Sequence, residues 1–158
     1  MTDTVLEQAA PPPRAAASAV LPCVLTWLLP GLGHLVLGCK RRAAVFCAVV
    51  LLTFGLGLAS DGAASVIDPR QPLSYLATFD NLALGPLDLV ARWRTFGRIV
   101  YRLPADEGDP VRVALTDRLR ARVRSVTYEY GNTFLLTAGL MNLLLMLDVF
   151  DIASGRKR

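Results

Sequence analysis

Long apolar runs alternate with short polar breaks along this chain, and the two longest runs predict helices. Residues 43 to 59 hold seventeen positions without a charged side chain, directly after a basic triplet at 40 to 42. A helix needs about 20 apolar residues to cross a bilayer core of about 30 Å, and about 17 is the short end of the range. Residues 133 to 150 form a second run near that length, with one charge at Asp148. Both runs predict membrane-spanning helices.

A third apolar segment, residues 19 to 38, is interrupted by Pro30 and Gly31. Proline inside a helix removes a backbone hydrogen bond and clashes with the preceding turn. The segment therefore either spans the membrane with a kink or turns back as a hairpin into residues 43 to 59. Carbonyls freed in lipid must be satisfied by neighbouring groups, so this end is expected to face protein.

The middle of the chain is more polar. Residues 76 to 90 form a fourth, less apolar segment that includes Asp80, Asn81, Gly85, Pro86 and Asp88. That polar load suits a span, a re-entrant piece or an interfacial helix. From 92 to 130, arginines alternate with aromatic and aliphatic residues at helical spacing, which predicts basic amphipathic helices in the head-group plane.

These patterns predict an all-α fold: a small polytopic transmembrane helical bundle with three firm apolar segments, a fourth weak one and basic amphipathic interfacial helices. Seven stretches follow: a disordered tail (1–18), a helical membrane hairpin (19–60), a loop (61–75), the weak membrane or re-entrant segment (76–91), the basic amphipathic region (92–130), a C-terminal transmembrane helix (131–153) and a basic tail (154–158).

Composition and charge refine this picture. Hydrophobic residues make up 53% of the 158 positions, which is high for a soluble fold. The positive-inside rule favours one cytoplasmic face for the basic triplet and for region 92–130, which requires residues 76 to 90 to cross. We therefore expect four membrane segments with both termini outside. The three cysteines cannot all pair within one chain, so free thiols are expected.

The most motif-like segment is PGLGHLVLG, which contains Pro30, Gly31, Gly33, His34 and Gly38. Its glycines permit close backbone approach or positive φ, so they predict a tight helix-to-helix turn. His34 is the only histidine in the chain. We interpret it as a hydrogen-bond donor to the carbonyls that Pro30 frees; an axial haem ligand or a proton relay are the alternatives.

This segment resembles the two-transmembrane-helix hairpin domain. The matching positions are Gly31, Gly33, His34, Leu37 and Gly38. It departs from that domain at Val36, where a tyrosine is usual, and in a His-to-Gly spacing that is one residue shorter. Residues 19 to 158 resemble small uncharacterised bacterial membrane proteins that carry PGLGH near the start and an ending like residues 128 to 153. The resemblance implies a multi-pass protein of the bacterial inner membrane and names no reaction.

Two further sets of residues are candidates for contacts. Gly139 and Asn142 lie about one turn apart in the last apolar run, and a small residue beside an amide favours packing against a second helix. That helix belongs either to this bundle or to an oligomer. The basic residues expected to face anionic lipid are Lys40, Arg41, Arg42, Arg118, Arg120, Arg122 and Arg124.

The expected function is non-catalytic: a structural, assembly or accessory subunit that packs against itself or a larger membrane complex. We expect no enzyme activity, cofactor or metal, because no nucleophile elbow, phosphate loop or zinc helix is found. Nucleic acid is not an expected partner, because the arginines lie beside apolar spans and lack a binding motif. The alternative is a small transporter or a cofactor-bearing redox subunit that uses His34 with Asp80, Asp88 or Asp148.

Overall fold

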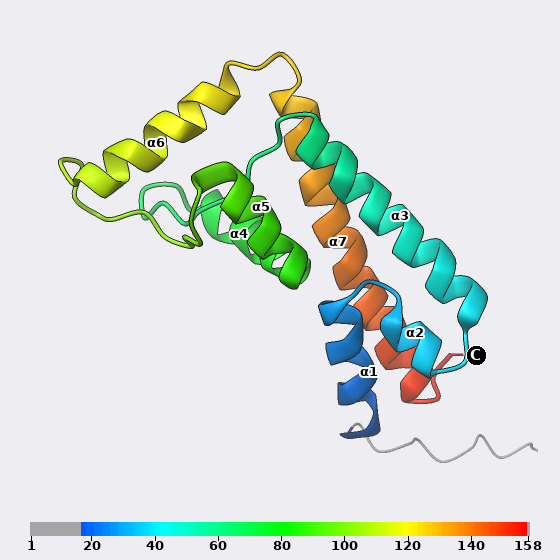
Figure 1. The fold of residues 1–158 in the computed structure, drawn as a ribbon. Helices are drawn as coiled ribbons and strands as arrows, with labels where there is room; N and C mark the ends of the chain where they lie inside the picture. Colours follow the sequence, from blue (N-terminus) through cyan, green and yellow to red (C-terminus); the bar gives the residue numbers. More distant parts are fainter. Residues whose placement is uncertain (1–16, 158) are drawn as a thin grey trace, which may run out of the picture.

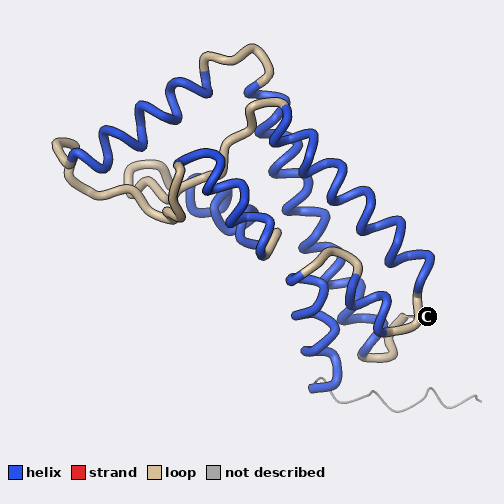
Figure 2. Tube along the Cα trace, in the orientation of Figure 1, coloured by secondary structure: helices blue, strands red, loops and turns tan. Residues whose placement is uncertain are grey.

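The computed structural model describes residues 17–157. This part of the chain folds into helices without a strand, apart from one isolated bridge between Ile67 and Arg102 (Figure 1; Figure 2). The helices are α1 (Ala17–Leu28), α2 (Leu32–Val36), α3 (Lys40–Ala59), α4 (Leu73–Ala83), α5 (Pro86–Phe96), α6 (Pro110–Val123) and α7 (Tyr128–Ala153). The predicted all-helical class is confirmed. The predicted tail lies outside the described residues except for its last two positions.

Two long helices, α3 and α7, run side by side in opposite directions (Figure 1). At 1.5 Å per residue, the 20 residues of α3 extend about 30 Å and the 26 residues of α7 extend about 39 Å. Both are long and apolar enough to cross a membrane. Glycine brings them together at one end, because a Cβ on Gly131 would lie only 2.3 Å from the carbonyl oxygen of Ser60.

The third apolar segment forms a hairpin. Helix α1 ends at Leu28, the chain turns through Pro30 and Gly31, and the short helix α2 packs back against α1 (Figure 1). A Cβ on Gly33 would lie 2.3 Å from the carbonyl oxygen of Pro22, so glycine is needed for this packing. The 12 residues of α1 extend about 18 Å, well short of a bilayer core. The sequence left open a kinked span or a hairpin into residues 43 to 59; the structure turns back within the segment, between α1 and α2, before α3 begins.

The expected fourth segment is also broken. Residues 76 to 90 belong to two 11-residue helices, α4 and α5, which are joined at Leu84 and Gly85. Gly85 has φ 62°, and Pro86 begins α5, where a missing N–H costs no helical hydrogen bond. Each helix is about 16 Å long, so neither crosses a bilayer alone. Four spanning segments are therefore not shown: in the described residues, two helices meet the length and composition of a span.

Region 92–130 is likewise more varied than the expected pair of amphipathic helices. It contains the end of α5, a loop, α6 and the first turn of α7. Helix α6 starts after Asp109, whose carboxylate accepts a hydrogen bond from the backbone N–H of Val111 at 2.7 Å. The turn after α3 is joined to the turn before α7 by Asp61, which accepts hydrogen bonds from Ser125 and Thr127. These hydrogen bonds lower the pKa of the Asp61 carboxyl.

The buried apolar residues form a core along the contact of α3 and α7 and continue beneath α5 and α6. In the first part of this core, Val50 and Phe54 of α3 pack with Leu135 and Leu145 of α7. Its second part contains Leu84, Phe96, Leu103 and Leu115. This core holds α7 against the α4–α5 hairpin and so positions the polar groups described next.

Candidate functional site

The two hairpins meet end to end beside the middle of α7. A Cβ on Gly85 would lie 2.0 Å from the carbonyl oxygen of Trp27, so the turn between α4 and α5 touches the end of α1. The indole Nε1 of Trp27 donates to the Leu82 carbonyl at 2.9 Å, and this oxygen also accepts from the backbone N–H of Gly85. The indole hydrogen bond therefore fastens the end of α1 to the turn of the second hairpin.

Asn142 and Gly139 place α7 at this junction. The Asn142 Nδ2 donates to the Ala83 carbonyl at 2.8 Å, and the side chain is fully buried. One turn earlier, a Cβ on Gly139 would lie 2.5 Å from both the carbonyl and carboxylate oxygens of Asp80. The two residues predicted from sequence to pack against a second helix thus pack against α4 of the same chain.

Asp80 is the most unusual group at the junction. Its side chain is 7% exposed, and neither carboxylate oxygen has a hydrogen-bond partner among the described residues. The Asn142 Oδ1 is also buried without a partner, as are oxygens of Thr78 and Asn81. From the sequence, Asp80 was one of two acids in a less apolar segment and one of three aspartates considered for a transporter or redox role. Asp80 is buried because α7 packs against it at Gly139, and this contact cannot be predicted from the sequence of α4 alone.

His34 lies at the other end of α7. Its Nε2 is 2.9 Å from Asp148 Oδ2, and Lys157 contacts the second carboxylate oxygen. The ring is fully buried, with its edge against Phe46. The expected partner, a carbonyl freed by Pro30, is replaced by a carboxylate 114 residues away. The Nδ1 atom of the same ring is buried without a partner among the described residues, and the Nε2 contact fastens α2 to α7.

The remaining motif residues act through the backbone. Pro30 is buried, and Gly31 has φ 89° with its Cβ position 2.6 Å from the Ala43 carbonyl oxygen. Gly38 has φ 83° but open space around its Cβ position, so only its backbone conformation favours glycine. The motif therefore builds the tight turns between α1, α2 and α3.

A buried ion pair that sequence reasoning missed joins α5 to two loops. Arg92 Nε lies 2.7 Å from Asp88 Oδ2, and both side chains are fully buried. The Nη1 atom donates to the carbonyls of Ser65 and Val100 at 2.9 and 2.6 Å, while the guanidinium lies 3.9 Å from the centre of the Tyr101 ring. The spacing of four residues between Asp88 and Arg92 was the available signal.

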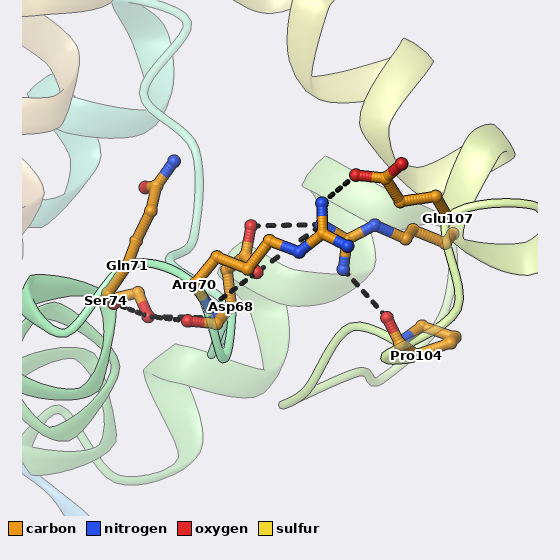
Figure 3. Close-up of polar contacts among 7 residues, drawn as sticks. Asp68, Arg70, Gln71, Ser74, Pro104 and Glu107 are labelled. Carbon is orange, nitrogen blue, oxygen red and sulfur yellow. Dashed lines mark hydrogen bonds and ion pairs between the residues drawn. The ribbon is translucent and has the colours of Figure 1, made fainter.

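A surface cavity of about 410 Å³ lies between the loop after α3, α4, α6 and the start of α7. At its rim, Arg112 Nη2 is 3.2 Å from Asp68 Oδ2, and Arg112 Nη1 donates to Pro104. The backbone of Asp68 exchanges hydrogen bonds with the Ser74 hydroxyl (Figure 3). A second ion pair joins Arg70 to Glu107 (Figure 3). These contacts join two loops to α6. The guanidinium groups of Arg112 and Arg70 at the rim are therefore already bonded to groups of the protein.

Comparison with known proteins adds one finding. Residues 21–158 match a family described as a family of unknown function (DUF6677). The chain belongs to this family. No curated protein and no solved structure matches it. The DUF6677 match begins within α1 and includes α2 to α7. The expectation of an uncharacterised family is confirmed.

The arginines expected to face lipid have mixed surroundings in this DUF6677 protein. Arg118 donates to the Phe96 carbonyl at the end of α5, and Arg122 donates to Gly62 and Arg94. Arg120 pairs at the surface with Asp117, and Arg124 is exposed. Lys40, Arg41 and Arg42 form the exposed first turn of α3. Contact of these residues with lipid stays a prediction.

Metal-binding side chains do not gather in the described part of the DUF6677 chain: no three His, Cys, Asp or Glu residues are grouped between positions 17 and 157. The three cysteines are free and half-buried. The chemistry that the site offers is therefore that of single buried groups: one carboxyl at Asp80, one imidazole at His34 and one ion pair at Asp88 and Arg92.

Proposed function

We propose that this chain is an integral membrane protein with a non-catalytic role, as a structural, assembly or accessory subunit. In this proposal α3 and α7 cross the bilayer, and the α1–α2 and α4–α5 hairpins enter it from opposite faces. Placement in a bacterial inner membrane rests on the resemblance of the sequence. The observation that carries the membrane location is the exposure of apolar side chains along the two long helices.

Only 22% of the most apolar window of α3 and 33% of that of α7 is buried within the protein. The core helix of a soluble protein would be mostly buried. The exposed side chains include Val45, Val49, Leu52 and Leu56 of α3 and Leu140, Leu144 and Leu147 of α7. Burying apolar surface contributes about 25 cal/mol per Å², so an exposed band of this kind favours lipid or a partner over water.

The lengths of the two hairpins support the same location. Helices α1 and α4 are about 18 and 16 Å long, so end to end they match a bilayer core of about 30 Å. Half-length helices are tolerated in lipid only where protein groups satisfy the broken backbone. Asn142 does this for the Ala83 carbonyl of α4, and the backbone N–H of Gly85 together with Trp27 does it for the Leu82 carbonyl.

The accessory role is supported by how this chain uses its polar side chains. Trp27, Asn142 and Arg118 each donate to a main-chain carbonyl of the same chain, so they build the fold. The outer faces of the helices remain apolar and available to lipid, to a second copy or to a larger membrane complex.

One preparation from native membranes tests both halves of the proposal. We expect the protein to stay in the membrane pellet through alkaline carbonate and high salt, because its attachment is apolar rather than electrostatic. After mild detergent extraction, affinity purification should yield a homo-oligomer or a stoichiometric membrane complex. Release by carbonate would contradict the membrane location, and a lone monomer that catalyses solute uptake in proteoliposomes would contradict the accessory role.

The second candidate function is a small transporter, and one observation favours it. Asp80 is a buried carboxyl without a protein partner, and ionisable groups within membrane segments mark ion or proton pathways in many transporters. Transport would require a path along the bundle or between copies of the chain. The uptake assay above separates this candidate from the accessory role.

A further inference from the structure

We propose that the Asp80 carboxyl is a binding site for one monovalent cation, a proton or a sodium ion, within the membrane-embedded part of the fold. The inference uses the proposed membrane location but not the accessory role. Carbonate extraction tests that location separately, so a failure of the membrane location and a failure of cation binding can be told apart.

The Asp80 carboxyl is buried and has no partner in the described part of the protein. Asp80 is 7% exposed, and both carboxylate oxygens are buried without a hydrogen bond among residues 17–157. A buried carboxylate is stable only with a paired charge, hydrogen bonds or a bound ion; otherwise it takes up a proton. The described protein groups supply no such partner, so the compensating charge must come from a ligand.

The described helices packed around Asp80 supply no positive charge to it. Helix α7 has no titratable residue between Tyr130 and Asp148, and the described part of α1 has only Cys23. On α5, the Arg92 Nε and Nη1 atoms bond to Asp88, Ser65 and Val100, and the guanidinium lies against the Tyr101 ring, while Nη2 has no partner in the described part of the chain. Among the described residues, no cation forms an ion pair with Asp80.

The local backbone adds to the negative potential at this carboxyl. Asp80 lies in the last turn of α4, where the C-terminal end of a helix attracts positive charge. The absent side chain at Gly139 gives the carboxylate its place against α7, because any Cβ there would lie 2.5 Å from Oδ2. The position is thus shaped for a carboxyl group and favours a cation beside it.

The available atoms define the chemistry of the ligand. Beyond the Asp80 carboxylate, the unpartnered buried oxygens on α4 and α7 are Asn142 Oδ1, Asn81 Oδ1 and Thr78 Oγ1. Oxygen donors suit hard cations, and a single carboxylate balances a single positive charge. A divalent metal would leave excess charge in the apolar interior. The chemistry points to sodium or a proton.

The test compares wild type with Asp80→Asn, which keeps the shape and removes the charge. Purified full-length protein in mild detergent is unfolded thermally between about pH 5 and about pH 9, with sodium or with choline at equal ionic strength. In choline, wild type should lose stability as pH rises above the usual aspartate range near about 4, because the unfolded state then releases the carboxyl proton while the buried native carboxyl keeps it. Asp80→Asn should lack this loss.

Sodium distinguishes the two ligands. If sodium binds, it should raise the unfolding temperature of wild type at high pH by on the order of 5 °C and leave Asp80→Asn unchanged. If the ligand is a proton, wild type should respond to pH alone. Equal responses of both proteins to pH and to sodium, including no response, would overturn the proposal.

A second measurement needs no variant and so covers a failure of Asp80→Asn to fold. Dicyclohexylcarbodiimide adds to a protonated carboxyl in apolar surroundings and leaves a stable acylurea. Mass spectrometry of wild type should find this adduct on Asp80, with less of it at high pH or in sodium. Asp88, paired with Arg92, serves as the unmodified internal control. Modification that spares Asp80 would overturn the proposal.

Discussion

Arg92→Met is expected to lower the free energy of unfolding by about 3–5 kcal/mol, because it leaves the buried Asp88 carboxylate without its partner. The change also removes the hydrogen bonds from Nη1 to the carbonyls of Ser65 and Val100. Those carbonyls belong to the loops on either side of the α4–α5 hairpin. Thermal or denaturant unfolding of the purified protein in mild detergent measures the loss.

Two further variants make this result specific. Arg120→Met breaks an exposed pair with Asp117 and is expected to change stability by less than about 1 kcal/mol. The double variant Asp88→Leu with Arg92→Met removes both charges and should recover a large part of the loss, because replacing a whole buried pair by apolar groups is often neutral. Equal effects of Arg92→Met and Arg120→Met would contradict the buried role of Arg92.

Gly85→Ala is expected to destabilise the protein by about 3 kcal/mol or more, because two separate costs combine at this residue. Its φ of 62° is unfavourable for alanine, and the new Cβ would lie 2.0 Å from the carbonyl oxygen of Trp27. That oxygen is backbone and cannot swing away. The two hairpins must therefore separate, which should also weaken the hydrogen bond from Trp27 to Leu82.

The matched control is Gly55→Ala in α3, where the added methyl group meets no atom within 4 Å. Because alanine is the better helix former by about 1 kcal/mol, this variant should be as stable as wild type or more stable. Unfolding in detergent and the rate of limited proteolysis near residue 85 report both variants. If Gly85→Ala is as stable as Gly55→Ala, the end-to-end contact of the hairpins is wrong.

Elements whose signal is local were predictable from the sequence. The charge-free run after Arg42 and the apolar run that includes Asp148 indicated the two long helices α3 and α7. Pro30 and Gly31 indicated the interruption that separates α1 from α2. In each case the deciding physics, apolar length or the loss of a backbone hydrogen bond, acts within a few residues.

The misses share a different cause. Gly85 and Pro86 were noted as polar load rather than as a helix boundary, although proline at the first helical position is a start signal. His34 was assigned a partner nearby in the chain, whereas its carboxylate partner is Asp148 on α7. Arg92 was counted with interfacial arginines, because its carbonyl partners lie in loops that only the fold brings together. Long-range contacts decide each case.

The number of crossings is the central claim, and cysteine labelling tests it most directly. Cys39 lies just before α3, position 108 lies in the loop before α6, and position 156 follows α7. Three single-cysteine proteins would retain Cys39 or carry Gly108→Cys or Arg156→Cys in a cysteine-free background. A membrane-impermeant maleimide is applied to intact cells and to inverted vesicles.

With two crossings, positions 39 and 156 should label from the same face and position 108 from the opposite face. Four crossings would instead place positions 39 and 108 together, with position 156 opposite. That second pattern would contradict the two half-length hairpins and the junction at Trp27 and Gly85. Labelling of all three positions in a fraction without membranes would contradict the membrane location itself.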